Sequence, residues 1–198
     1  MEEYIWITLP QAIEHSNIPQ AAHCFLWFRD EGCSENADRA YVLMQMRSDG
    51  MIGFPGGYID ECIKTYDEIL LGLNRELKEE IDYSQEAITI DDYICSHKRN
   101  SNNPLIVHFF AKKLTKEQFE SIEKSHTRAM HFSIESLGLF RVPIALNATI
   151  RKEFLSNFLQ NQFAGNSKRQ FLYTLFKLNL INESAYNELS RESKISYE

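Results

Sequence analysis

The sequence has few cysteines, no long apolar run and no excess of positive charge. Its four cysteines form no C-x-x-C pair and show no zinc-ligand spacing; they are Cys24, Cys33, Cys62 and Cys95. We therefore expect reduced thiols in an intracellular protein. The N-terminal residues lack the basic start and apolar run of a signal peptide, and no stretch approaches the roughly 20 apolar residues that span a membrane. These absences predict a soluble protein with no membrane partner.

The charge balance gives no general attraction to nucleic acid. With a formal net charge of −7, the chain could hold a polynucleotide only on a local basic patch. The candidates for a basic rim that binds RNA are Lys98, Arg99, Lys112, Lys113 and Lys152. A set of this size is also typical of an ordinary solvated surface, which is the more frequent case.

Hydrophobic patterning predicts one mixed α/β domain with a helical C-terminus. The length of 198 residues suits a single domain, and no internal repeat or low-complexity linker divides the chain. Strands are expected over residues 22–28, 41–47, 87–94 and 105–113, with short extended segments at 132–136 and 138–142. Helices are expected over about 66–81, 116–125, 150–162 and 167–179, followed by a short third C-terminal helix.

One acidic cluster lies in the helix expected over residues 66–81. Glu76, Glu79 and Glu80 are three and four residues apart, so they share a helix face with Cβ atoms about 5–6 Å apart. Like charges at this spacing repel, whereas a divalent cation would stabilise them, because Mg²⁺ and Mn²⁺ prefer carboxylate oxygens. Alone, the cluster would more often be a solvated acidic face. The preceding Arg75 and the turn Gly-Phe-Pro-Gly-Gly at 53–57 favour a metal site.

These residues resemble the signature of the Nudix hydrolases, G-x5-E-x7-R-E-U-x-E-E-x-G-U, in which U is a bulky apolar residue. The second half of the signature fits residues 75–83. The first half departs from it, because seventeen residues separate Gly57 from Arg75, where the signature has thirteen. Asp67 stands where the first glutamate belongs, and Asp82 replaces the final glycine. The longer loop leaves Asp67 open as a site residue or a surface acid.

Blocks outside the signature resemble the inosine diphosphatase and nucleolar RNA decapping branch of these hydrolases. They are residues 43–47, 49–50, 53–57, 72–77, 96–97, 108–109, 111–112, 137–139 and 141–143. The resemblance runs from about residue 20 to 182. It implies a single Nudix domain over residues 1–198, an α/β/α sandwich with a mixed sheet that commonly forms a homodimer. It also implies a location in the nucleus, including nucleolus and nucleoplasm, and in the cytoplasm.

The resemblance implies a hydrolase that uses Mg²⁺ or Mn²⁺ for attack of water on a phosphoanhydride. Glu76 and Glu80 are the expected first ligands, with the Gly56 carbonyl as a backbone ligand. Glu79 is either a further ligand or the base that takes the proton from water. Arg75 is expected to pair with a signature carboxylate and orient it.

Five residues outside the signature receive roles by resemblance. His97 is expected at the metal–phosphate centre, as a ligand or proton donor. His23 is expected to contact the base, and Arg47 the base or a phosphate. Phe54 offers a stacking plane, and Gln170 can donate and accept at a purine edge. Without the resemblance, His23 and Phe54 would be core residues, Arg47 could equally form a surface ion pair, and Gln170 would be solvated.

The implied substrates are purine nucleoside diphosphates of the inosine or deoxyinosine type and capped RNA. ADP-ribose linked to protein is a further pyrophosphate that such a site could accept. The competing interpretation is a catalytically weak or inactive Nudix-fold module of the syndesmos type, which binds RNA or protein. The retained Arg75, Glu76, Glu79 and Glu80 favour an enzyme. The sequence ranks neither the two substrates nor the two metals, because both substrates present a purine and a phosphoanhydride and both metals prefer oxygen ligands.

Overall fold

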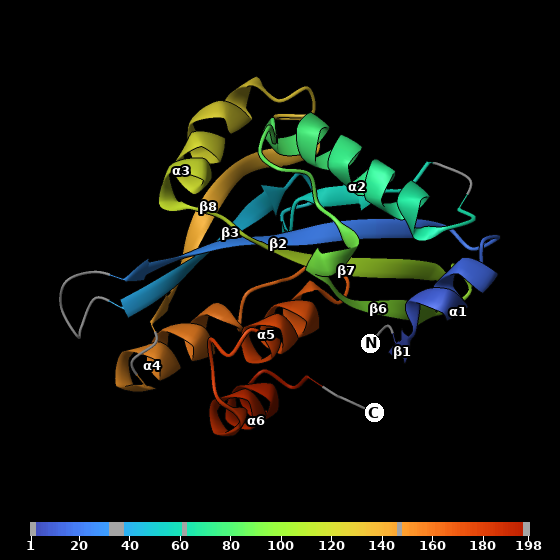
Figure 1. The fold of residues 1–198 in the computed structure, drawn as a ribbon. Coiled ribbons are helices and arrows are strands. Elements are labelled where there is room, and N and C mark those ends of the chain that lie inside the picture. Colours follow the sequence, from blue (N-terminus) through green and yellow to red (C-terminus); the bar gives the residue numbers. More distant parts are fainter. Residues whose placement is uncertain (1–2, 32–37, 61–62, 146–147, 196–198) are drawn as a thin grey trace.

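A mixed sheet lies between two layers of helices in the computed structural model, which describes residues 3–31, 38–60, 63–145 and 148–195 (Figure 1). The described strands are β1 (Glu3–Ile7), β2 (Gln20–Glu31), β3 (Asp38–Arg47), β4 (Ile52–Gly53), β5 (Gly56–Tyr58), β6 (Tyr93–Asn100), β7 (Leu105–Lys113) and β8 (Ser136–Ala145). The described α-helices are α1 (Leu9–Glu14), α2 (Tyr66–Ile81), α3 (Lys116–Ser125), α4 (Ala148–Phe158), α5 (Ser167–Lys177) and α6 (Glu183–Glu192). Helices α2 and α3 cover one face, and α4 to α6 cover the other. The predicted α/β sandwich with a helical C-terminus is confirmed.

Strand β2 is the centre of the sheet. The main path runs β1-β6-β7-β2-β3-β4, while β5 pairs with β2 and β8 pairs with β3. β2 runs parallel to β7 and antiparallel to β3 and β5. In the pairing of β2 with β5, His23 lies opposite Gly56, and Ala22 lies opposite Gly57. The glycine turn is therefore fixed directly beside the central strand.

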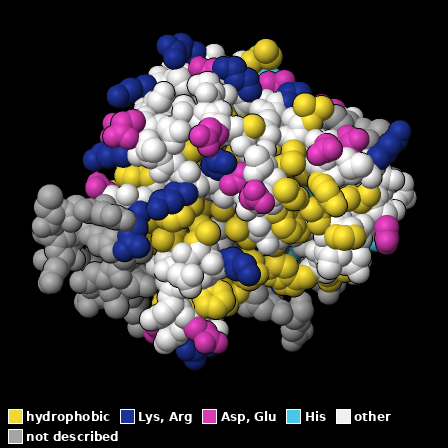
Figure 2. Space-filling model, in the orientation of Figure 1, with side chains coloured by type: hydrophobic (Ala, Val, Ile, Leu, Met, Phe, Trp, Pro, Cys, Tyr) yellow, Lys and Arg dark blue, Asp and Glu magenta, His cyan; other side chains and the backbone are white. Residues whose placement is uncertain are grey.

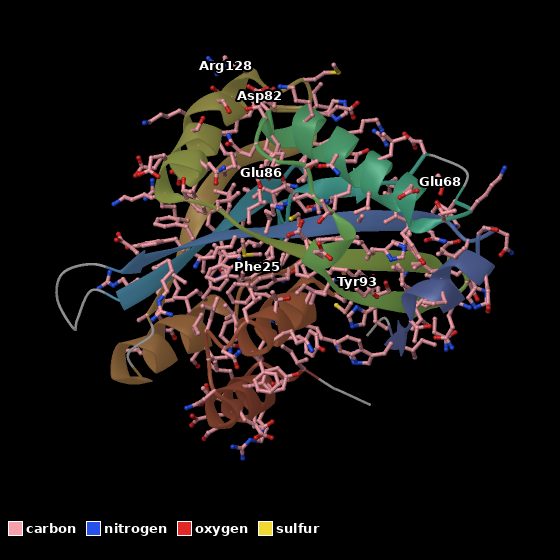
Figure 3. The ribbon with its side chains drawn as sticks, in the orientation of Figure 1. Phe25, Glu68, Asp82, Glu86, Tyr93 and Arg128 are labelled. Carbon is pink, nitrogen blue, oxygen red and sulfur yellow. The ribbon has the colours of Figure 1, made fainter. Side chains whose placement is uncertain are left out.

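The continuous apolar run of β2 is buried on both faces of the sheet. Successive side chains of a strand point to opposite faces, so Phe25 packs in the core toward the C-terminal helices (Figure 3), while Leu26 and Phe28 pack toward α2 and α3. A strand covered on both faces has no polar alternation, which explains its sequence.

The sequence of α2 determines both of its ends. Thr65 caps the first turn, since its side chain accepts from the Asp67 amide and Glu68 accepts from the Thr65 amide at 2.8 Å. The helix ends at Asp82, which adopts the left-handed conformation at φ 54° and pairs with Arg128. Figure 3 shows Glu68 at one end of α2 and Asp82 beside Arg128 at the other. Asp82 thus takes the helix-ending conformation that suits the glycine of the signature.

Other boundaries differ from the predictions. The prediction of a strand over residues 87–94 is wrong for most of that range. Thr89 and Asp92 form a capping box that starts a 3₁₀ turn, η1 (Ile90–Asp92), so β6 begins only at Tyr93. The predicted extended segments of 132–142 are replaced by the longer β8, and a second 3₁₀ turn, η2 (His126–Arg128), follows α3. Residues 3–14, for which the sequence predicts no element, form β1 and α1.

Two cysteines belong to the described core. Cys24 and Cys95 are buried free thiols, as expected, whereas Cys33 and Cys62 lie outside the described residues. Across the described ranges, none of the helices has the length and apolar character required to cross a membrane.

Candidate active site

A cleft of about 740 Å³ opens where the glycine turn meets α2. Its walls come from β2, β5, the end of β3, the acidic face of α2, the turn before β8 and the segment that leads into α5. Eight of the site residues predicted from the sequence line it: His23, Arg47, Gly56, Arg75, Glu76, Glu79, Glu80 and Gln170. Segments far apart in the sequence therefore converge on one cavity.

Two glutamates of α2 are buried against the glycine turn. Glu76 is 7% exposed and Glu80 is 3% exposed. Glu80 accepts a hydrogen bond from the Gly56 amide at 2.8 Å and one from Gln45 Nε2 at 3.2 Å. Burial raises the pKa of Glu80 to about 7, and it also raises the pKa of Glu76, with Glu135 adding repulsion to both. Charged carboxylates are thus held close together at a cost that a cation would relieve.

Arg75 lies over the outer edge of the carboxylates. Its guanidinium contacts Glu76 Oε1 at 2.7 Å, Glu79 Oε2 at 3.0 Å and Asp60 Oδ2 at 3.0 Å, and it donates to the Tyr58 carbonyl. A planar guanidinium with several donors fixes the carboxylates that it contacts. This arrangement has the geometry of an orienting residue.

A histidine and a glutamate absent from the sequence candidates complete the cluster. Glu76, His131 and Glu135 each bring one ligand atom within 4.8 Å of the others. His131 Nδ1 is buried, has no hydrogen-bond partner among the described residues, and lies 3.7 Å from Glu135 Oε2. An unsatisfied ring nitrogen beside two carboxylates fits a divalent cation. His131 and Glu135 are four residues apart, but they lie in a segment without helical periodicity, so their spacing alone indicates nothing.

A second set of polar groups lines the same cleft. His23 Nδ1, Gln170 Nε2 and Asn166 Nδ2 are buried without hydrogen-bond partners in the described part of the chain. Burial, with a smaller contribution from Arg47, lowers the pKa of His23 to about 4, so its imidazole is neutral near pH 7. Arg47 itself forms a pair with Asp49, with Nη2 2.9 Å from Oδ2. These buried groups can bind a polar ligand that replaces water.

Two predicted site residues do not reach the cleft. Phe54 is 1% exposed and packs at ring centroid distances of 4.8 Å from Phe109 and 5.8 Å from Phe25, so it is a core residue and offers no free stacking plane. His97 is fully buried in β6, where the ring of Trp6 covers it at a centroid distance of 4.1 Å. The structure therefore does not bring His97 to the carboxylates.

The remaining candidates are dispersed on the surface. Asp67 is exposed in the first turn of α2 and does not line the cleft. Lys112 pairs with Asp92, Lys113 lies over the Trp27 ring, and Arg99 reaches the cleft. The side chain of Lys152 lies outside the described residues. Figure 2 shows positive and negative side chains interspersed on the face that it presents, which gives that face no single-sign character.

Comparisons with known proteins identify the family. A family model described as Nudt16-like, U8 snoRNA-decapping enzyme-like, matches residues 20–181. A U8 snoRNA-decapping enzyme of Xenopus laevis is 39% identical over 159 residues, which cover 78% of this chain and 72% of that protein. The enzyme of the same name from Ovis aries is 37% identical over 175 residues, covering 85% and 86%.

A relative with a different name matches as well. A Tudor-interacting repair regulator protein of Gallus gallus is 37% identical over 150 residues, which cover 76% of this chain and 46% of that protein. The chain thus spans less than half the length of that relative.

Solved structures agree on the fold. A mutT/nudix family protein from Listeria innocua matches with a TM-score of 0.54 at 12% identity, covering 81% of this chain and 94% of that one. The NUDIX domain of Shewanella oneidensis NrtR, solved with ADP ribose, matches with a TM-score of 0.53 at 15% identity, covering 87% and 99%. At these identities the likeness shows the fold alone. Together with the family match over residues 20–181, it shows that this chain has the Nudix fold and belongs to the Nudt16-like family of Nudix hydrolases.

Proposed function

We propose that this protein hydrolyses a phosphoanhydride bond in purine nucleoside diphosphates of the inosine type and in the cap of RNA, with a divalent cation. The observation that carries the proposal is one cleft that contains both a Glu76, His131 and Glu135 cluster and the unpaired polar groups of His23 and Gln170. The first set suits a cation and a diphosphate, and the second suits a base.

The carboxylate end of the cleft would hold Mg²⁺ or Mn²⁺ on Glu76, His131 and Glu135. When bound, the cation supplies neutralisation of phosphate oxygens and a lower pKa for bound water. Glu80 keeps the glycine turn in place through the Gly56 amide, at 2.8 Å. This contact gives Glu80 a positioning role beside the role of ligand expected from the sequence, and it leaves the Gly56 carbonyl as a proposed backbone ligand.

Glu79 is the proposed general base. Its side chain lines the cleft and is 23% exposed, so water can reach it, and Arg75 Nη1 holds its Oε2 at 3.0 Å. A base must lie within hydrogen-bond reach of the proton that it removes, and the fixed carboxylate of Glu79 meets this need for a water molecule in the cleft. Arg75 keeps Glu76 and Glu79 oriented while the phosphoanhydride is cleaved.

The polar groups of β2 and α5 are the proposed base-binding site. Gln170 can both donate to and accept from a purine edge, and the neutral His23 can do the same with its two ring nitrogens. Arg47 lies beside them and would contact the base or a phosphate. Inosine diphosphate and capped RNA both present a purine next to a phosphoanhydride, so the same cleft serves both.

The proposed cellular setting is nuclear and cytoplasmic. The resemblance implies a location in the nucleus, including nucleolus and nucleoplasm, and in the cytoplasm, and the name U8 snoRNA-decapping enzyme of several relatives supports the nuclear part of this proposal. The resemblance also implies a homodimer. Size-exclusion chromatography coupled to light scattering would measure this oligomeric state.

The second candidate is a Nudix-fold module that binds RNA or protein without turnover. The match to the Tudor-interacting repair regulator protein at 37% identity favours it. The cluster of Glu76, His131 and Glu135, which could hold a cation, and the pairing of Arg75 with Glu76 favour hydrolysis.

The test is release of phosphate from inosine diphosphate, with and without millimolar Mg²⁺ or Mn²⁺, for the native chain and Glu76→Gln. The matched control is Asp67→Asn, which removes one negative charge from the same helix outside the cleft. We expect cation-dependent turnover in the native chain and in Asp67→Asn, and a loss of at least about 100-fold in Glu76→Gln, the scale of other catalytic deletions. No turnover of inosine diphosphate or capped RNA by the native chain would favour the binding module.

A further inference from the structure

We propose that His131 supplies a nitrogen ligand to the cation site, so that the site prefers divalent transition metals, with Mn²⁺ as the probe, over Mg²⁺. The proposal rests on the proposed function for the location of the site and adds the class of metal that it takes. It concerns an imidazole in a cluster otherwise built from carboxylates: Glu76, His131 and Glu135.

The first support is the position of the ring nitrogen. The ligand atoms of the three residues all lie within 4.8 Å of one another, and His131 Nδ1 is 3.7 Å from Glu135 Oε2. This separation is too long for a hydrogen bond, and Nδ1 has no other hydrogen-bond partner among the described residues although it is buried. The His131 side chain is 27% exposed and that of Glu135 is 52% exposed, so a cation can reach the pair from solvent. Because Nδ1 makes no hydrogen bond among the described residues and lies beside two carboxylates, it is available as a ligand.

The second support is the backbone that holds the ring. The His131 amide donates to the Glu79 carbonyl at 2.9 Å, which ties the turn to α2. The amides of Ile134 and Glu135 both donate to the His131 carbonyl at 3.1 Å, and the Ser48 amide donates to the Glu135 carbonyl at 2.9 Å. Both side chains therefore project from a turn that is fixed to the signature helix and to the end of β3. A ligand pair held in this way needs little reorganisation to bind a cation.

The chemistry of the donor set gives the preference. Mg²⁺ demands oxygen ligands and keeps several water molecules. Mn²⁺ also binds carboxylate oxygens, but as a first-row transition metal it accepts an imidazole nitrogen beside them more readily than Mg²⁺ does, and later metals of the row do so more strongly. The two carboxylates and the imidazole together offer three ligand atoms to one divalent ion. A site that presents a nitrogen as its third ligand gains affinity for Mn²⁺ that Mg²⁺ does not share.

The test measures Mn²⁺ binding to the full chain in the absence of substrate, with electron paramagnetic resonance as the readout. Pulsed measurement of bound Mn²⁺ should show a ¹⁴N coupling from a directly bound imidazole. Competition with Mg²⁺ gives the ratio of the two affinities. His131→Ala should abolish the ¹⁴N coupling and weaken Mn²⁺ binding about tenfold or more, while Mg²⁺ binding changes by less than about threefold.

Two further variants sharpen the result. His131→Asp places an oxygen the same number of bonds from Cβ as Nδ1, so it should lose the ¹⁴N coupling and shift the affinity ratio toward Mg²⁺. The matched control is His126→Gln, a nearby histidine outside the cleft whose Nδ1 faces the Glu123 carbonyl at 2.8 Å. This variant should keep the coupling and the ratio.

The outcomes separate this proposal from the proposed function. Bound Mn²⁺ without ¹⁴N coupling in the native chain overturns the nitrogen ligand, even if hydrolysis depends on metal. A coupling that is lost in His131→Ala establishes it, even if neither inosine diphosphate nor capped RNA is cleaved. The measurement on the native chain needs no variant, so a variant that fails to fold leaves the decision intact.

Discussion

Replacement of Gly57 by alanine would disturb the site without changing a charge. A Cβ built on Gly57 would lie 2.4 Å from Glu76 Oε2 and 2.7 Å from its Cδ. Ordinary contact begins near 3.4 Å, so the carboxylate must move by about 1 Å. The atom that must move is the far end of a side chain, which can rotate away. The fold therefore tolerates the methyl group, while Glu76 is displaced from His131 and Glu135, the other residues proposed to hold the cation.

The expected loss is about 100-fold in kcat/KM, or about 2.7 kcal/mol, because a misplacement of about 1 Å at a reacting centre costs this much. The free energy of unfolding should stay within about 1 kcal/mol of that of the native chain. The assay is cation-dependent phosphate release from inosine diphosphate, beside urea denaturation.

The adjacent glycine supplies the contrast. A Cβ on Gly56 would lie 2.2 Å from the Ala22 carbonyl oxygen, and Gly56 has φ +125°, which other residues rarely adopt. Since backbone cannot rotate away, Gly56→Ala should destabilise the fold by about 2–3 kcal/mol or more. Full activity in Gly57→Ala would refute the proposed place of Glu76 in the site. Equal destabilisation by both substitutions would refute the steric argument.

The remaining predictions concern Glu80 and Phe54. Glu80 binds its proton more tightly when folded, since burial raises its pKa from 4.5 to about 7, so the metal-free protein should lose about 3 kcal/mol of stability as pH rises through that window. Urea denaturation in EDTA at a series of pH values measures this loss. Glu80→Gln should remove most of it. If the free energy of unfolding of that variant still falls with pH as steeply as that of the native chain, the assignment to Glu80 is contradicted. Phe54→Leu should lower stability by about 1–2 kcal/mol and leave KM for inosine diphosphate within about twofold, because the ring packs in the core. A tenfold rise in KM with intact stability would restore the stacking role.

Elements whose hydrophobic periodicity and capping residues lie within their own segment can be predicted from the sequence. Helix α2 follows the predicted 66–81, because apolar residues on one face and the Thr65–Glu68 capping box act within the segment. The burial of Glu76 and Glu80 follows from the same helix face. The pairing of Arg75 with Glu79 was also accessible, since residues four apart are neighbours on a helix.

Tertiary contacts decided what the sequence could not predict. His131 and Glu135 reach the cleft because a turn without periodicity is bonded to α2 and to the end of β3. His97 lies away from the cleft because Trp6, in a strand that the sequence did not predict, covers its ring. Phe54 lies two residues before the cleft residue Gly56, yet its ring turns toward Phe171 in the core.

The central claim is that water attacks a phosphoanhydride at the Glu76 cluster with a divalent cation present. The direct measurement is incubation of inosine diphosphate with the native chain in ¹⁸O-labelled water, with Mn²⁺ or Mg²⁺ and with EDTA, followed by mass spectrometry of the products. We predict inosine monophosphate and phosphate only with a cation, and one ¹⁸O atom incorporated for each bond cleaved. Absence of cleavage with either cation, and equally for capped RNA, would contradict the claim.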